Sequence, residues 1–555
     1  MMLSKNLLLA ALQGAFVLIT VLLVEARAQA QSGFISIDCG ISENSSYTDE
    51  TTGLAYISDT NFTEAGENHE ITPTNKLQTD EKQFWNLRSF PQGKRNCYTL
   101  KPVHGKGQRY LIRARFMYGN YDNENTIPKF DLYIGVDFWS TILLKYTWSV
   151  HNEEIIHVAL SDYVRVCLVN TGFGVPFISA LELRPLNNET YVSEIGTSLN
   201  LYGRFDFASA TDRTTRYIDD VYDRFWSPVQ TEVWKPLNVS LRDENNAMSM
   251  NLYEPPSAVM STAYTRNNSY SYMGMNWIDL NTSSRYFFFM HFAELKNLRT
   301  NQTREFDIFI NGKLWFGPLA PLYLRQTTIY SSTTGISPDT EGNIQIFINK
   351  TANSTLPPLI NAMEIYVLNE LSLKETDQTD VDAILNIKRV YGVKKNWQGD
   401  PCAPVTYVWD GLNCTYANSS HRITSLDLSS SGLVGEISPY IANLRMLQSL
   451  DLSNNSLTGM VPEYIGQLSF LRVFAEANVM VNQNSTSPTN ETSSSSSLGY
   501  WCKNNKFVVP LFSTIGLLYF INLVRRIYIA LHVPRGTGGP KSGGLSFPKA
   551  PGADF

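Results

Sequence analysis

Basic stretches and catalytic signatures are scarce in this chain of 555 residues. Its 45 Lys and Arg residues are outnumbered by 51 Asp and Glu residues, and the net charge of −6 leaves no basic stripe that could follow a phosphate backbone. We therefore expect no nucleic acid partner. The hydrophobic content of 43% argues against a disordered chain, and the length allows roughly three or four domains.

Histidines are few, and no motif predicts a metal or cofactor site. His151 and His157 stand six residues apart, not at the spacing of four that a helical zinc motif uses. Gly536–Ser542 only weakly resembles a phosphate loop. The paired carboxylates Asp219–Asp220 and Glu153–Glu154 could do acid–base chemistry on a glycan, although adjacent carboxylates more often face water. We expect no cofactor, no metal and no catalytic residue.

Two hydrophobic segments lie near the ends of the chain. Residues 1–30 combine Lys5, an apolar run and small residues ending at Ala30, which is typical of a cleaved signal peptide; an uncleaved anchor helix is the alternative. Residues 507–524 are apolar and precede Arg525, which predicts one transmembrane helix with its N-terminus outside the cell. Residues 525–555 would then form a short cytoplasmic tail of a plasma-membrane protein.

Glycosylation sequons support export. All fourteen Asn-x-Ser/Thr triplets lie between the two hydrophobic segments, which fits one extracellular stretch. They start at Asn44, Asn61, Asn188, Asn238, Asn267, Asn281, Asn301, Asn349, Asn353, Asn413, Asn418, Asn454, Asn484 and Asn490.

A long block of sequence occurs twice. Residues 109–139 recur without a gap as 285–315, and two further blocks follow in the same order. Within the blocks apolar and polar residues alternate, as in Phe130–Ile134 and Phe306–Ile310, which predicts strands and hairpins. We infer that one domain is present twice, at residues 31–186 and 187–371, and that each copy is an antiparallel β-sandwich.

A second, shorter repeat follows. Residues 379–392 have helical spacing and belong to a helix and cysteine-containing cap at 372–422. From residue 423 an apolar ladder recurs every 24 residues, which predicts leucine-rich repeats at 423–480, with Asn455 capping backbone groups of a turn. The third repeat is degraded, so the solenoid must pack on the helix and cap. Residues 481–506 form a Ser-rich linker.

Six cysteines suit an oxidising compartment, although an even count does not fix their pairing. Cys402 and Cys414 are the most credible disulfide because they lie close together in one small segment. Cys167 aligns with Phe347 in the second copy, and we expect it to be a buried free thiol. The pairing of Cys39, Cys97, Cys167 and Cys502 stays open.

Groups suited to ligand binding are better represented than catalytic ones. Tyr118, Asn120, Tyr121 and Asp122 directly follow a predicted strand, where a loop could present two aromatic rings beside amide and carboxylate groups. We interpret this loop as the ligand-binding site; a locally packed turn is the alternative. The second copy has Glu294–Asn297 at the aligned positions, so the loop was not duplicated with the framework.

Several of these motifs are distinctive together: Gly33–Gly40, Arg115–Asp122, Phe177–Pro185, Asp219–Trp226, His291–Glu294, Asp400–Cys402, Trp409–Gly411 with Cys414, and the repeats at Leu426 and Leu450. Residues 33–474 resemble the tandem malectin-like ectodomain of plant leucine-rich-repeat receptor kinases. The resemblance implies two jelly-roll-like malectin-like domains, a short repeat solenoid and one transmembrane helix, with a sensing role at the plant cell surface.

The kinase motifs of that family have no counterpart in the sequence. We therefore expect a kinase-less receptor-like protein, not an enzyme, which binds an extracellular glycan or peptide, or the ectodomain of a co-receptor kinase. The alternatives are an extracellular glycan hydrolase and a nonfunctional truncated splice product.

Overall fold

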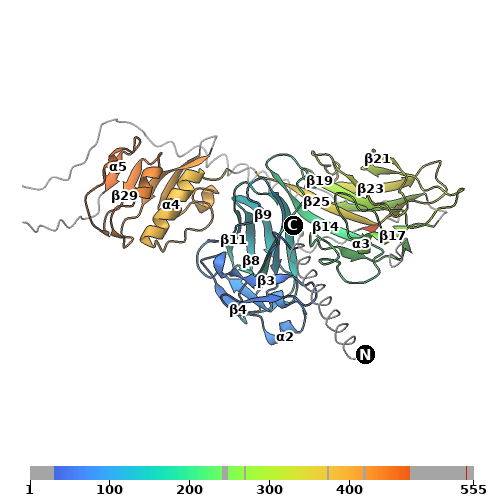
Figure 1. Cartoon of the computed structure of the whole chain (residues 1–555), viewed down its shortest axis with the longest axis horizontal. Coiled ribbons are helices and arrows are strands. Elements are labelled where there is room, and N and C mark those ends of the chain that lie inside the picture. The colour runs from blue at the N-terminus through green and yellow to red at the C-terminus, as the bar shows by residue number, and fades with distance from the viewer. Residues whose placement is uncertain are drawn as a thin grey trace, which may run out of the picture. The chain divides into compact units, whose positions relative to one another are not determined.

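The protein is mainly built of β-strands, as the sequence predicts. The computed structural model describes residues 31–240, 248–267, 271–371, 374–416, 420–475 and 545–546 (Figure 1). The predicted signal peptide, Ser-rich linker and membrane segment lie outside these residues, as do Asn418, Asn484, Asn490 and Cys502. Among the described residues, no helix has both the length and the apolar character needed to cross a membrane.

The first half of the β region contains thirteen strands and a short helix α2 (Pro73–Lys76). The strands are β1 (Ile35–Asp38), β2 (Ser46–Thr48), β3 (Ala55–Ser58), β4 (Glu67–Glu70), β5 (Asn86–Ser89), β6 (Arg95–Leu100), β7 (Arg109–Phe116), β8 (Lys129–Ile134), β9 (Asp137–Leu143), β10 (His151–Val158), β11 (Val164–Phe173), β12 (Phe177–Ile178) and β13 (Ala180–Pro185).

The second half has the helix α3 (Ser257–Met260) and a similar series of strands. They are β14 (Thr197–Phe207), β15 (Ser227–Val229), β16 (Lys235–Asn238), β17 (Thr262–Thr265), β18 (Tyr272–Ile278), β19 (Tyr286–Phe292), β20 (Phe306–Ile310), β21 (Lys313–Leu319), β22 (Thr327–Tyr330), β23 (Asn343–Lys350), β24 (Leu359–Ile360) and β25 (Ala362–Glu370). The strand β32 (Leu545–Ser546) pairs with β18.

The duplication seen in the sequence is confirmed in the strand order. One sheet of the first half runs β6-β11-β8-β9, and its counterpart in the second half runs β18-β23-β20-β21. Each half has its own buried core, to which strands of two sheets contribute. The aligned pairs Phe116–Phe130 and Phe292–Phe306 bring their rings to 5.8 and 5.4 Å across these two cores. The copied block is therefore the framework that joins two sheets around a core.

The two halves are not separate sheets, which corrects the expectation of independent sandwiches. β14 of the second half pairs with β10 of the first through Ile155–Asn200 and Ile156–Leu199, and with β25 on its other side. One 11-stranded sheet therefore runs through both halves. Strand alternation predicts each strand but does not show which edges will meet.

The region after residue 371 contains the predicted helix and repeats. The helix α4 (Gln378–Tyr391) begins after Asp377, whose carboxylate accepts the Thr379 N–H at 3.0 Å, and ends at Gly392 in the left-handed conformation. The other elements are β26 (Leu412–Tyr416), β27 (His421–Asp427), β28 (Val434–Gly435), β29 (Ser449–Asp451), β30 (Ser456–Leu457), α5 (Glu463–Gly466) and β31 (Val473–Ala475).

The repeat period is confirmed by the register of the parallel strands. Leu426 pairs with Leu450, and Leu450 with Phe474, so each step is 24 residues and the degraded third repeat still supplies a strand. Asn455 donates to the carbonyls of Leu428 and Leu452 and accepts the N–H of Leu433, as expected for a residue that caps the turn. The core of this region extends from α4 to the repeats.

Candidate functional site

The predicted ligand loop lies at the end of β7, but Tyr118 does not face solvent. Its ring is fully buried in the first core, and its hydroxyl donates to the Asp122 carboxylate. Burial, followed by the hydrogen bond to Asp122, raises the pKa of Tyr118. Tyr118 thus holds the loop in place and offers no free aromatic face in this structure.

Backbone hydrogen bonds fix the rest of the loop. The Gly119 carbonyl accepts from the Thr72 N–H at 3.0 Å and from the Asn75 side chain at 3.1 Å. A Cβ on Gly119 would stand 2.3 Å from Ile71, so only glycine fits there. Asn120 has a φ of 53° and its side chain accepts the Asn125 N–H at 2.8 Å. The loop is therefore a well-defined turn, which was the alternative to an open binding loop.

Tyr121 is the loop aromatic that remains partly exposed. Its ring lies 4.8 Å from that of His69 on β4 and 5.6 Å from that of Tyr118. Burial, followed by the charge of Asp122, raises the pKa of Tyr121 to about 12, so its hydroxyl is a neutral hydrogen-bonding group over the physiological range. Asn120 and Asp122 are likewise half-buried beside it.

An exposed aromatic pair adjoins this loop, and sequence reasoning missed it. The Gly119 N–H donates to the Thr147 carbonyl at 2.8 Å, which places the turn 144–149 against the loop. Tyr146 and Trp148 flank Thr147, and their rings stack at 4.9 Å with an interplanar angle of 4°. They are 46% and 52% exposed. Two aromatic residues at i and i+2 in a turn were the available signal.

We call Asn120, Tyr121, Asp122, Tyr146 and Trp148 the aromatic surface. A stacked pair held on a hydrogen-bonded turn presents a preformed apolar face, and the amide and carboxylate groups beside it can orient a polar ligand. In the second copy the position of Tyr118 is occupied by Glu294, which forms a buried ion pair with Arg304 at 2.6 Å. The loop is therefore specific to the first half.

Buried arginines and carboxylates form a different kind of site where the halves join. Arg113 on β7 binds Glu154 on β10 at 2.8 Å, and Arg204 on β14 binds the same Glu154 at 2.8 Å and Glu364 on β25 at 2.7 Å. The chain of ion pairs thus crosses four neighbouring strands of the 11-stranded sheet. All these side chains are buried.

The segment 216–226 contributes further charged residues to this cluster. Asp223 accepts from Arg184 at 2.9 Å, and Asp220 binds Arg224 at 2.9 Å. We call the buried cluster the arginine joint; it comprises Arg113, Arg184, Arg204, Arg224, Glu154, Glu182, Asp220, Asp223 and Glu364. Burial alone would raise the pKa of Glu182, but the guanidinium of Arg113 and its neighbours hold it well below its usual range.

Three of the carboxylates and both histidines singled out in the sequence have partners within the structure. Asp220 and Glu154 are bound by arginines in the joint, and Glu153 bonds His151 at 2.9 Å. His157 is buried, which lowers its pKa to about 4, and it bonds Ser198 at 2.8 Å. On the same strand, His151 and His157 are about 20 Å apart, too far to share a metal ion.

The disulfides correct one expectation. Cys97 and Cys167 lie opposite each other on β6 and β11 and are bonded, so Cys167 is not the free thiol that its alignment with Phe347 suggested. The copy that has phenylalanine simply lacks the crosslink. Cys402 is bonded to Cys414, the pair expected from their proximity, and Cys39 is a buried free thiol.

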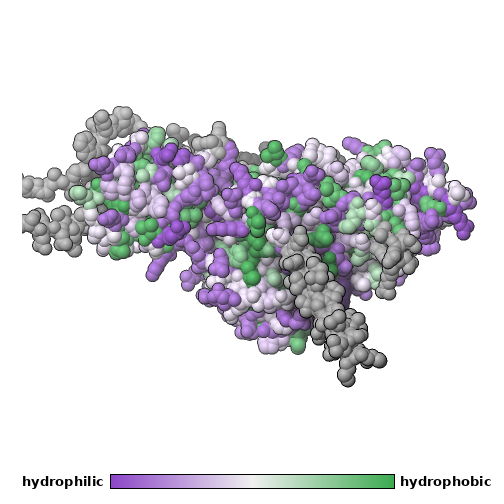
Figure 2. Space-filling view, in the orientation of Figure 1, coloured by the Kyte–Doolittle hydropathy of each residue, from purple (hydrophilic) through white to green (hydrophobic). Residues whose placement is uncertain are grey.

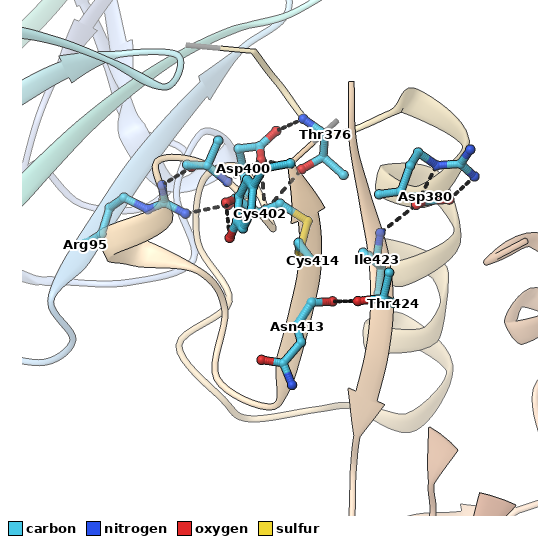
Figure 3. The surroundings of a disulfide bond; sticks show 12 residues. Arg95, Thr376, Asp380, Asp400, Cys402, Asn413, Cys414, Ile423 and Thr424 are labelled. Atoms are coloured by element: carbon cyan, nitrogen blue, oxygen red, sulfur yellow. Dashed lines mark hydrogen bonds and ion pairs between the residues drawn. A yellow bond between two sulfur atoms is a disulfide. The ribbon is translucent and has the colours of Figure 1, made fainter. Parts of the chain in front are cut away.

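The cap that contains Cys402–Cys414 is organised by one carboxylate (Figure 3). Asp400 is buried and accepts the N–H groups of Thr376, Cys402 and Ala403 at 3.0, 3.0 and 2.9 Å. Arg95 on β6 donates to the carbonyls of Ala403, Gln398 and Asp400 at 2.5–2.7 Å. These bonds attach the cap to the first half of the β region.

The sequons are mostly accessible. Of the eleven sequon asparagines in the described residues, ten are exposed; Asn349 on β23 is half-buried. In the view of Figure 2, hydrophilic residues cover most of the coloured face and hydrophobic ones form separate groups. These ten exposed asparagines are therefore accessible for modification.

Comparisons with known proteins agree with the fold. Residues 37–368 match the malectin-like domain family, and residues 446–468 match the leucine-rich repeat. The crystal structure of the plant receptor-like kinase ANX2 is similar, with a TM-score of 0.50 at 17% identity, over 60% of this chain and 96% of that chain. At that identity the likeness shows the fold alone.

Two relatives from Arabidopsis thaliana are much closer in sequence. A probable LRR receptor-like serine/threonine-protein kinase is 47% identical over 77% of this chain and 49% of its own length. The LRR receptor-like serine/threonine-protein kinase IOS1 is 43% identical over 76% of this chain and 46% of its own length. The chain spans about half the length of these curated relatives. It belongs to the malectin-like domain family, and its close homologues are LRR receptor-like kinases of Arabidopsis.

Proposed function

We propose that this malectin-like receptor ectodomain binds an extracellular glycan at the aromatic surface. The stacked, half-exposed Tyr146–Trp148 pair carries the proposal, because apolar faces of sugar rings stack on exposed aromatic rings. Asn120 and Asp122 would orient the sugar hydroxyls beside the rings. A shallow surface of this kind suits an extended chain of sugars.

Binding is better supported than hydrolysis. A glycan hydrolase needs two carboxylates facing one substrate, one of them able to donate a proton. In the described part of the chain, Glu154, Glu182, Asp220, Asp223 and Glu364 are buried and bound to arginines. Carboxylates held in this way are neither accessible to a sugar nor prone to protonation.

The proposal extends to the setting of the receptor. The protein acts as a single-pass plasma-membrane protein with a signal peptide at 1–30, malectin-like halves at 31–186 and 187–371, repeats at 423–480 and an anchor at 507–524. It acts by pairing with the ectodomain of a co-receptor kinase. Oligosaccharides on the fourteen sequon asparagines would cover much of the remaining surface.

The test is a calorimetric titration of the purified protein with neutral tetrasaccharides, namely cellotetraose, xylotetraose and maltotetraose. Replacing Trp148 by alanine should weaken binding of the preferred sugar roughly fivefold to tenfold, about 1–1.5 kcal/mol for a lost aromatic contact. Phe470→Ala is the matched control, because Phe470 is 46% exposed but lies in the repeats. Equal affinities of Trp148→Ala and the unmodified protein, or no binding of any of the three sugars, would rule out the aromatic surface.

A further inference from the structure

A cleft of about 1120 Å³ opens between the first half of the β region and α4. Its floor is the outer face of β6 and β11, where Thr99 and Arg165 lie opposite each other; the neighbouring Val164 and Val166 point the other way, into the first core. Its wall is α4, through Asp382 and Leu385 among others.

Two contacts between side chains bridge the cleft. The Tyr163 hydroxyl donates to Gln378 at 3.3 Å, and Lys388 forms an ion pair with Glu64 at 2.6 Å. Both contacts involve exposed groups, so water competes for them and each contributes little. The firm attachment of the cap is at Arg95, whose bonds go to backbone carbonyls. A ligand can therefore replace the bridging contacts without detaching the cap.

Arg165 is the unusual residue of the floor. It is 7% exposed and its guanidinium lies 4.3 Å from the ring centre of Tyr163. Its Nη1 is buried without a hydrogen-bond acceptor, and no carboxylate in the described part of the chain pairs with it within 4.0 Å. A guanidinium stays charged at physiological pH, and a buried charge without a partner is costly. An anionic group beside Arg165 would offset this cost.

The acids that line the cleft do not supply that anion. Glu64 is paired with Lys388, the Asp382 carboxylate accepts from Gln378 at 2.8 Å, and Asp162 accepts the Lys106 N–H at 3.2 Å. Burial, followed by the charge of Asp400, raises the pKa of Glu375 overall; Glu375 is close enough for the charge of Arg165 to act in the opposite direction, but it forms no ion pair with Arg165 within 4.0 Å.

Basic side chains stand at the mouth of the cleft. Lys101, Lys106 and Arg389 line it and are exposed. Their positive field favours the approach of an anionic group. A carboxylate matches the planar donor edge of a guanidinium better than any neutral group does.

We propose that this cleft binds an acidic peptide, with a side-chain carboxylate of the peptide paired to Arg165. Sugars are disfavoured because Trp397 and Trp409 are buried and stack on each other at 5.2 Å, and Arg165 lies over one face of Tyr163. Exposed Leu160 and the mixed charges of the rim instead suit peptide side chains. This site is separate from the aromatic surface, so either can fail alone.

The test selects displayed random heptapeptides on the full-length protein in detergent, with Asn61→Gln run in parallel because Asn61 is a sequon at the cleft. The selected peptides should be enriched in Asp or Glu at one fixed position. Changing that acid to its amide, or Arg165 to Gln, should weaken binding about tenfold or more. Lys313→Gln is the control, because Lys313 is exposed in the second half and its charge change is the same.

A second variant keeps the proposal falsifiable if Arg165→Gln fails to fold. Thr99 lies directly opposite Arg165, so Thr99→Glu brings a carboxylate of the chain itself to the guanidinium. This variant should unfold at a higher temperature than Thr99→Gln and should lose the peptide. Selected peptides without acidic enrichment, equal binding by Thr99→Glu and Thr99→Gln, or tighter Arg165-dependent binding of trigalacturonate than of the peptides would overturn the acidic-peptide site.

Discussion

The first half of the β region meets its two neighbours through arginines, and the two interfaces treat them differently. In the arginine joint, Arg113 and Arg204 each bind two carboxylates within 2.8 Å, and the sheet is continuous across the contact. Against the cap, Arg95 binds only carbonyls and Arg165 binds no carboxylate among the described residues. The arginines of the joint are therefore fully paired within the chain, whereas Arg165 at the cap interface can still bind an anionic ligand.

Removing an arginine from the joint should have the largest effect on stability. Arg204→Ala removes one of the two arginine partners of the buried Glu154 and the closest ion-pair partner of the buried Glu364, and we expect a loss of about 3–5 kcal/mol in the free energy of unfolding. Urea denaturation followed by tryptophan fluorescence measures it. The matched control is Arg285→Ala: Arg285 pairs with Glu194 and Glu370 at the surface, where the loss should be below about 1 kcal/mol. Similar losses of stability in both variants would contradict the distinction between buried and surface ion pairs.

The second largest effect should come from low pH, which weakens the ion pairs of the arginine joint. Burial raises the pKa of Glu364, but Arg204 and His291 lower it well below its usual range, and Asp223 is likewise lowered by Arg216 and Arg184 despite burial. A lowered carboxylate pKa stabilises the fold above the unfolded value, 4.5 for Glu and 3.8 for Asp, and this stability is lost as the pH falls further.

The titration of Asp38 should change the stability in the opposite direction, with a loss as the pH rises. Burial raises its pKa to about 7 against a hydrogen bond from Tyr47 that lowers it, so its contribution is complete below pH 3.8 and is lost as the pH rises toward 7. Melting temperatures measured from pH 2.5 to 8 should fall on the acid side in both the unmodified protein and Asp38→Asn. Between pH 4 and 7, Asp38→Asn should decline less; parallel curves there would show that Asp38 does not titrate in the fold.

The sequence predicted the repeated elements well because they repeat. The copied strand block and the 24-residue ladder each appear in the structure, since periodic apolar residues determine which face is buried. Contacts between residues far apart in the sequence have no such periodic pattern. The bond between Cys97 and Cys167 spans 70 residues and depends on the register of β6 against β11, and the Phe347 comparison pointed the wrong way.

The candidate site was predicted only in part for a similar reason. Tyr118 continues the alternation of Phe116, so its inward direction could have been inferred from the strand, whereas its place beside the 144–149 turn could not. Tyr146 and Trp148 show their stacking only after the turn has formed. Nothing in the sequence indicated the buried arginine joint, because its acids and arginines come from six separate segments.

The Tyr118 hydroxyl provides a smaller, local test of the aromatic surface. Tyr118→Phe keeps the ring in the core but removes the hydrogen bond to Asp122, and we expect a loss of about 0.5–1.5 kcal/mol in stability. Glycan affinity should fall slightly if Asp122 orients the sugar, which calorimetry measures beside the unfolding experiment. An unchanged affinity with reduced stability would assign Asp122 to the turn alone.

The smallest expected loss of stability, that of Arg165→Met, distinguishes the cap interface most clearly from the arginine joint. Arg165→Met keeps much of the side-chain volume and removes a buried charge that has no carboxylate partner, so stability should stay within about 1 kcal/mol of the original or rise. Arg113→Met, made in the same way, strips Glu154 and Glu182 of a partner and should cost several times more. Urea denaturation of the two variants side by side compares them. If Arg165→Met loses as much stability as Arg113→Met, then Arg165 already has a partner within the chain. The cap interface would then resemble the arginine joint and have no unpaired charge for a ligand.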